Sequence, residues 1–310
     1  MLKFSYLIFI ILFLFTKAFA ISYSTMSTEE FNKSGFIEKN NEDFHNISIV
    51  DNKIFSNLSD EIILIYLPGS TRDDLSDEHC TIKSEFFSLI ELIKYKPNNK
   101  NINLYLLCSH LLFGDKGFPD GIDQPSVYPG ISKHERYRAN IIKKLKEFIE
   151  MGLNPKNIFL IGHSCGAWHG LHLLDKSENF FNSTIAISPA CFGPRSLWKH
   201  RRNLMKRREA EINFIKQIKI FDPLIFLGKE DLRENTDSLK RIININTVNF
   251  VQLPNKNNDG IFYVNDTICT WHNNEGIQKW FILDSHNLHF SRCFVDYTND
   301  IINFINLKLK

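Results

Sequence analysis

Short, largely apolar runs recur along the chain and alternate with segments whose apolar residues follow helical spacing. The runs typical of strands buried on both faces are 62–67, 102–108, 158–161, 184–187 and 224–227, and 249–253 is a further expected strand. The segments with helical spacing are 82–95, 134–151, 197–218 and 294–309. Strands that alternate with helices predict an α/β fold, a mostly parallel central sheet with helices on both faces.

The two ends of this pattern are less regular. Residues 21–42 are polar and mixed, so we expect a loosely held N-terminus, followed by a first strand at 44–50 that residues 53–55 continue as a hairpin. Near the other end, 261–264 and 280–283 predict an extra hairpin inserted around residues 255–284. We find no repeat or linker, which predicts a single domain over residues 21–310.

The first twenty residues have the layout of a signal peptide. Lys3 gives a basic start, residues 4–15 form an apolar run, and Ala18-Phe19-Ala20 matches an A-x-A cleavage site. The run is shorter than the roughly 20 residues that span a bilayer. We expect cleavage near Ala20, export to the periplasm or medium, and no membrane span afterwards. An uncleaved anchor is the alternative, because Lys17 lies close to the site.

Charge gives no indication of a nucleic-acid partner. The chain has 37 Lys and Arg residues and 35 Asp and Glu residues. Removal of the leader, which contains Lys3 and Lys17, leaves 35 of each. Residues 199–208 hold six of the basic residues, which could face an anionic substrate or a membrane. Glu209 and Glu211 follow at once, so we interpret the run as a solvated helix face.

The strongest chemical signal is Gly162-His163-Ser164-Cys165-Gly166, a G-x-S-x-G motif. An apolar strand precedes it and a segment with a helical apolar face follows it. In this context the motif predicts a nucleophile elbow, a strained strand-to-helix turn that presents the hydroxyl of Ser164 above the edge of a sheet. The amides at the start of the following helix favour negative charge at the same place.

The order of the motifs along the chain resembles the α/β-hydrolase superfamily, in its esterase and dienelactone-hydrolase-like branches. The resemblance covers residues 44–310 and lies in the elbow and in four other places. These are Leu67-Pro68-Gly69-Ser70, Ile187-Ser188-Pro189, residues 225–231 and His289, with Asn154-Pro155 leading into the elbow strand. It implies an α/β-hydrolase fold and a triad in the chain order Ser, acid, His.

For the acid, the resemblance points to Asp231, three residues past Gly228 at the end of a predicted strand, with Glu230 as the neighbour able to replace it. For the base we choose His289, which precedes the C-terminal helix, with His286 as the runner-up. The 58 positions between Asp231 and His289 require an insertion that loops out. Without it, Asp259 or Asp266 could serve as the acid.

The resemblance also implies an oxyanion hole made of two backbone amides. One is that of Cys165, after the nucleophile, and the other is expected from Ser70 after an early strand. No Cys/His set has a zinc-binding spacing and no phosphate-binding glycine motif is present. We therefore expect neither a metal nor another cofactor.

The six cysteines, an even number in a chain expected to be exported, predict disulfides. Cys269 and Cys293 flank one C-terminal stretch and are the expected pair. Cys165 lies at the start of a buried helix, and we expect it to be a small buried filler rather than a bridge or a nucleophile.

The expected activity is hydrolysis of a small-molecule or lipid-like carboxylic ester through an acyl-enzyme on Ser164. A peptidase or thioesterase could use the same triad, because the triad does not decide which bond is cleaved. A binding protein on a hydrolase fold with an incomplete triad is the non-enzymatic alternative. The sequence gives no indication of the oligomeric state.

Overall fold

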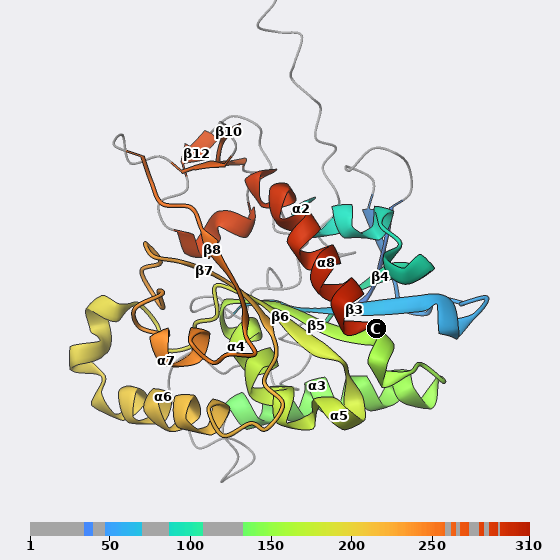
Figure 1. The fold of residues 1–310 in the computed structure, drawn as a ribbon, viewed down its shortest axis with the longest axis horizontal. Helices are drawn as coiled ribbons and strands as arrows, with labels where there is room; N and C mark the ends of the chain where they lie inside the picture. The colour runs from blue at the N-terminus through green and yellow to red at the C-terminus, as the bar shows by residue number, and fades with distance from the viewer. Residues whose placement is uncertain are drawn as a thin grey trace, which may run out of the picture.

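A computed structural model describes residues 34–39, 47–69, 87–107, 133–257, 262–264, 267–272, 279–281, 285–290 and 292–310 (Figure 1). Its centre is an eight-stranded sheet with the strand order β2-β1-β4-β3-β5-β6-β7-β8. The strands are β1 (Gly35–Lys39), β2 (Ile47–Val50), β3 (Glu61–Leu67), β4 (Asn101–Leu106), β5 (Ile158–His163), β6 (Ser183–Ile187), β7 (Leu224–Gly228) and β8 (Asn249–Leu253). Every pairing from β4 to β8 is parallel, and only β1 pairs antiparallel with its neighbours. The prediction of a mostly parallel sheet is confirmed.

Helices cover both faces of the sheet, with α2 and α8 on one side and α3, α4, α5 and α6 on the other (Figure 1). The α-helices are α2 (Phe87–Ile90), α3 (Lys133–Glu150), α4 (Ser164–His172), α5 (Ser177–Phe180), α6 (Arg202–Ile215), α7 (Lys240–Ile243) and α8 (Thr298–Lys308). The 3-10 helices are η2 (Leu58–Asp60), η5 (Glu91–Lys94), η6 (Pro97–Asn99), η8 (Pro155–Asn157), η9 (Leu173–Lys176), η10 (Arg195–His200), η11 (Ser285–Phe290) and η12 (Arg292–Tyr297).

Strand β3 shows why a run such as 62–67 is apolar at every position. Ile62, Leu64 and Tyr66 pack into the core beneath α2 and α8, whereas Ile63, Ile65 and Leu67 pack against α3, α4 and α6. Successive side chains of a strand point to opposite faces, so a strand covered on both sides must be apolar at every position.

The N-terminal part of the sheet differs from the prediction. Residues 35–39, expected to be loosely held, form β1, and it is β1 rather than residues 53–55 that pairs with β2. Phe36 explains the difference, because it is buried and its ring packs against the rings of Tyr105 and Phe148, with centroids 5.0 and 5.8 Å away. The burial of Phe36, and of Ile37 beside it, therefore holds this short strand in the sheet.

The predicted hairpin around residues 255–284 is replaced by two small antiparallel sheets. In these, β9 (Tyr263–Val264) pairs with β10 (Thr267–Ile268), and β11 (Thr270–His272) pairs with β12 (Lys279–Phe281). Each strand pairs with its near neighbour, which closes shorter loops than the expected pairing of 261–264 with 280–283. The predicted Cys269–Cys293 disulfide is confirmed, with Cα atoms 5.5 Å apart, and it joins this region to η12.

Within the described ranges, none of the helices combines the length and the hydropathy that a membrane crossing requires. The predicted signal peptide, residues 1–20, lies outside the described residues.

Candidate active site

Ser164 lies where β5 ends and α4 begins, as the elbow prediction requires. Its φ of 52° is in the left-handed region, which residues other than glycine rarely adopt. The two motif glycines permit close approach: a Cβ on Gly166 would lie 2.1 Å from the Leu67 carbonyl oxygen, and one on Gly162 would lie 2.6 Å from the Ala167 nitrogen. The turn thus packs directly on the ends of β3 and β5. Its strained backbone conformation is that of Ser164.

Three buried side chains form a hydrogen-bonded series above this edge of the sheet. Ser164 Oγ lies 2.9 Å from His286 Nε2, and His286 Nδ1 lies 2.8 Å from Asp231 Oδ2. Ser164 Oγ is also 3.1 Å from the Ala190 carbonyl oxygen, so its single proton can be donated to either acceptor. A hydroxyl, an imidazole and a carboxylate in this order are the arrangement that activates a serine as a nucleophile.

The acid in contact with the histidine is Asp231 rather than Glu230. It follows β7, has no exposed surface, and accepts a hydrogen bond at Oδ1 from the Arg233 amide at 2.7 Å. Burial raises the pKa of Asp231 to about 7, although the Arg233 amide and charge lower it. The alternative acids Asp259 and Asp266 lie outside the described residues.

The histidine prediction requires a correction, because the residue between Ser164 and Asp231 is His286 and not His289. Both belong to η11. A 3-10 helix has about three residues per turn and rises about 2 Å per residue, so His289 is displaced by one turn, or about 6 Å. The local sequence offers two histidines one turn apart, and only contacts from distant parts of the chain distinguish them.

Two such contacts hold η11 over the sheet. A Cβ on Gly228, the last residue of β7, would lie 1.9 Å from Ser285 Oγ, so Ser285 packs directly on the strand end. His163 Nε2 lies 3.1 Å from the His286 carbonyl oxygen, and burial lowers the pKa of His163 well below 6.5, so the neutral ring donates this hydrogen bond. No pattern in the chain signals the contact between His163 and His286.

The start of α4 is consistent with the first of the two predicted oxyanion-hole donors, the Cys165 amide. The Cys165 amide belongs to the first turn of α4, and a Cβ on Gly69 would lie 2.9 Å from the Ser164 Cβ. The segment after β3 therefore approaches the nucleophile closely. Ser70, the predicted second donor, lies outside the described residues.

Cys165 is buried as expected, but its role as a mere filler is wrong. Its sulfur is bonded to that of Cys191, with Cα atoms 4.3 Å apart. The Ala190 amide donates to the Ser164 carbonyl oxygen at 3.1 Å, which places the next residue, Cys191, beside the elbow.

The basic run at residues 199–208 is a solvated face only in part. Lys199, Arg201, Arg202 and Lys206 are exposed, whereas Arg208 is buried. Arg208 donates to both carboxylate oxygens of buried Glu234, at 2.6 and 2.7 Å. This bidentate pair anchors the loop that carries Asp231 to α6.

The sequence matches no family model and no curated protein. Among solved structures, it is similar to an S-formylglutathione hydrolase from Agrobacterium tumefaciens (14% identity, 80% of this chain and 84% of that one, TM-score 0.45). It is also similar to an acetyl xylan esterase from Paenibacillus sp. R4 (13% identity, 66% and 71%, TM-score 0.45) and to Arabidopsis thaliana SOBER1 (14% identity, 81% and 100%, TM-score 0.42). The fold assignment rests on the strand order and the elbow geometry of this chain.

Proposed function

We propose that this chain is a serine hydrolase of the α/β-hydrolase superfamily that cleaves carboxylic esters through an acyl-enzyme on Ser164. The observation that carries the proposal is the series Ser164–His286–Asp231, whose two contacts of 2.9 and 2.8 Å lie at the carboxyl ends of parallel strands. Sites in open α/β sheets form at these ends.

Each residue has a distinct part in the proposed reaction. His286 Nε2 accepts the proton of Ser164 as Oγ attacks the ester carbonyl, and it then donates that proton to the departing alcohol. Asp231 holds the Nδ1 proton and stabilises the imidazolium. The Cys165 amide donates to the developing oxyanion, with the amide of Ser70 as the second proposed donor. A water molecule then attacks the acyl carbonyl while His286 Nε2 takes its proton, and His286 returns that proton to Ser164 Oγ as the bond between Oγ and the acyl group breaks.

A fluorophosphonate probe tests the nucleophile directly, because it reacts only with an activated serine. We expect mass spectrometry of the labelled, folded protein to place one adduct on Ser164, with none in Ser164→Ala or in heat-unfolded protein. A folded protein that takes no label would contradict the proposal. A panel of p-nitrophenyl esters, a thioester and peptide amides then ranks the scissile bonds, and peptide cleavage that exceeds ester cleavage would favour the peptidase alternative.

Export belongs to the same proposal and rests on residues 1–20 alone. N-terminal sequencing of the protein recovered outside the cytoplasm should begin near Ile21. An intact Met1 start on active protein would contradict cleavage.

A further inference from the structure

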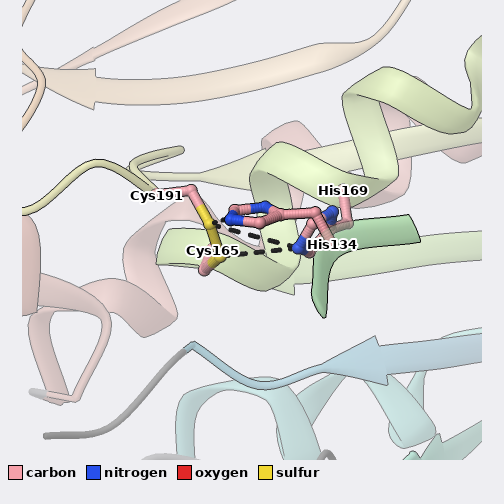
Figure 2. Close-up of side chains that lie close together, drawn as sticks. All are labelled: His134, Cys165, His169 and Cys191. Carbon is pink, nitrogen blue, oxygen red and sulfur yellow. Dashed lines mark hydrogen bonds between the residues drawn. A yellow bond between two sulfur atoms is a disulfide. The ribbon is translucent and has the colours of Figure 1, made fainter. Parts of the chain in front are cut away.

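Four side chains with metal-binding atoms converge beside the elbow: His134, Cys165, His169 and Cys191 (Figure 2). One potential ligand atom from each lies within 4.8 Å of the other three. The cluster stands apart from the series of Ser164, His286 and Asp231, and the proposed hydrolysis makes no use of its side chains.

Three segments that are distant in the sequence bring the four residues together. Cys165 and His169 are four residues apart on α4 and therefore share a face of that helix. Cys191 follows β6, and His134 lies in the first turn of α3 with its ring centroid 5.0 Å from that of His169. This scattered origin explains why no zinc-binding spacing is visible in the sequence.

Three distances between sulfur and nitrogen atoms of the cluster lie close to those in the shell of a single tetrahedral ion. Cys165 Sγ lies 3.5 Å from His169 Nε2, and Cys191 Sγ lies 3.7 Å from His134 Nδ1 and 4.0 Å from His169 Nε2. With Zn–S bonds of about 2.3 Å and Zn–N bonds of about 2.0 Å, neighbouring ligand atoms in a tetrahedral site are roughly 3.3–3.8 Å apart. Two imidazoles and two sulfurs also form a common ligand set of structural zinc.

We propose that His134, Cys165, His169 and Cys191 bind one zinc ion when both cysteines are reduced. The newly made chain carries them as thiols, so binding needs no reductant. Each thiol releases one proton, two Zn–S and two Zn–N bonds form, and zinc stays divalent. The disulfide drawn in Figure 2 is the alternative state of the same two cysteines, and the two sulfurs must separate to make room for the ion.

The surroundings of His169 favour metal binding over disulfide formation as the function of the cluster. The side chain is buried, and its Nε2 lies 3.5 and 4.0 Å from the two sulfurs, which are weak hydrogen-bond partners. A buried polar atom without a good partner costs about 1–3 kcal/mol. A disulfide requires no imidazole beside it, whereas coordination at Nε2 would give His169 a strong partner.

Zinc at this position would be structural and would stabilise the elbow. Four protein ligands leave no open position for water or substrate. The ion would join α4, α3 and the segment after β6 immediately beside Ser164, whose neighbour Cys165 supplies the proposed oxyanion amide.

Metal content and a cobalt spectrum test the site independently of hydrolysis. Full-length protein produced with zinc and purified under reducing conditions should hold about one zinc per chain. Cobalt substitution should give the intense thiolate-to-cobalt absorption and the visible bands of a tetrahedral ion. Cys191→Ser and His134→Asn should each lose most of the zinc, while His172→Gln, a change on the same helix outside the cluster, should keep it.

Reduced, folded protein that holds no zinc and gives no cobalt bands would overturn the proposal, and so would undiminished zinc in both ligand variants. Circular dichroism establishes that each variant is folded. Where Cys191→Ser does not fold, His134→Asn at the half-buried edge of the cluster and the cobalt spectrum of the unaltered chain decide the matter. Fluorophosphonate labelling of Ser164 is read separately, so failure of the hydrolase proposal would not be confused with failure of the zinc site.

Discussion

The elbow and the segment η11 supply the two halves of one catalytic contact, yet they are held in different ways. The elbow consists of five consecutive residues between β5 and α4, and its glycines pack on neighbouring backbone. In η11, a short 3-10 helix, His286 depends on distant partners, namely Gly228 beneath Ser285 and His163 beneath its own carbonyl group. A site can therefore combine a part encoded by local sequence with a part encoded by long-range packing.

The largest expected effect on stability comes from disrupting the elbow, the part encoded by local sequence. Gly166→Ala would place a Cβ 2.1 Å from the Leu67 carbonyl oxygen, and backbone on both sides leaves little room to shift. We expect the free energy of unfolding to fall by about 3–5 kcal/mol, with little active protein remaining. Urea unfolding followed by circular dichroism measures this.

Gly170→Ala is the matched control on the same helix. Its Cβ would meet a methyl group of Thr184 at 2.8 Å, a side-chain atom that can yield more easily. Its loss of stability should be clearly smaller than that of Gly166→Ala. Equal stability of the two variants would contradict the close packing inferred for the elbow.

Disrupting the packing of η11 on β7, the part encoded by long-range contacts, should reduce activity more than it reduces the free energy of unfolding. In Gly228→Ala the new Cβ would lie 1.9 Å from Ser285 Oγ, so η11 must move away from β7 and carry His286 with it. A displacement of about 1 Å lowers catalysis by about 100-fold, and we expect a loss of that size in kcat/KM.

Rescue of Gly228→Ala distinguishes displacement from general damage. Adding Ser285→Gly removes the two atoms that would clash with the new Cβ and leaves only Leu253 Cβ at 3.7 Å, so it should restore most of the lost activity. If the double variant is no more active than Gly228→Ala, the packing of Ser285 does not position His286.

Asp231, the acid that contacts His286 of η11, sets the expected pH dependence of ester hydrolysis. Burial raises the pKa of Asp231 to about 7, so this carboxylate takes up a proton as the pH falls through about 7. Protonated Asp231 no longer stabilises the imidazolium that forms when His286 accepts the Ser164 proton, so kcat/KM for a neutral ester should fall about tenfold per pH unit below that pH. Initial rates from pH 5 to 9 measure this, and a flat profile down to pH 5 would contradict it.

The parts of the molecule that sequence could predict are those in which neighbours in the chain are neighbours in space. The apolar runs became β3 to β8, the G-x-S-x-G motif became the elbow, and Asp231 after β7 contacts a histidine. The choice of His289 failed because His286 is selected by Ser285 and His163, which local pattern does not connect.

The remaining differences between the predictions and the structure also arise from contacts between distant parts of the chain. Strand β1 depends on the burial of Phe36 against distant rings. Cys165 meets Cys191, and both meet His134 and His169, only because α3, α4 and the segment after β6 converge. Long-range convergence of this kind leaves no periodic signal in a single sequence.

The smallest expected effect concerns His163, which we propose as a positioning residue for His286. His163→Phe removes the donor to the His286 carbonyl oxygen while keeping a similar ring, and loss of one hydrogen bond of about 1 kcal/mol predicts a five- to tenfold lower kcat. KM should not change. His163→Gln retains a donor and should recover part of the loss, whereas equal rates for all three proteins would remove His163 from this role.

The most direct test of the site as a whole compares two histidines one turn apart. Ester hydrolysis by His286→Gln should have a kcat lower by a factor of about 10⁴ or more, since a triad member acts as part of a unit. His289→Gln should stay within about threefold of the unaltered protein. A collapse of activity in His289→Gln with His286→Gln still active would contradict the account.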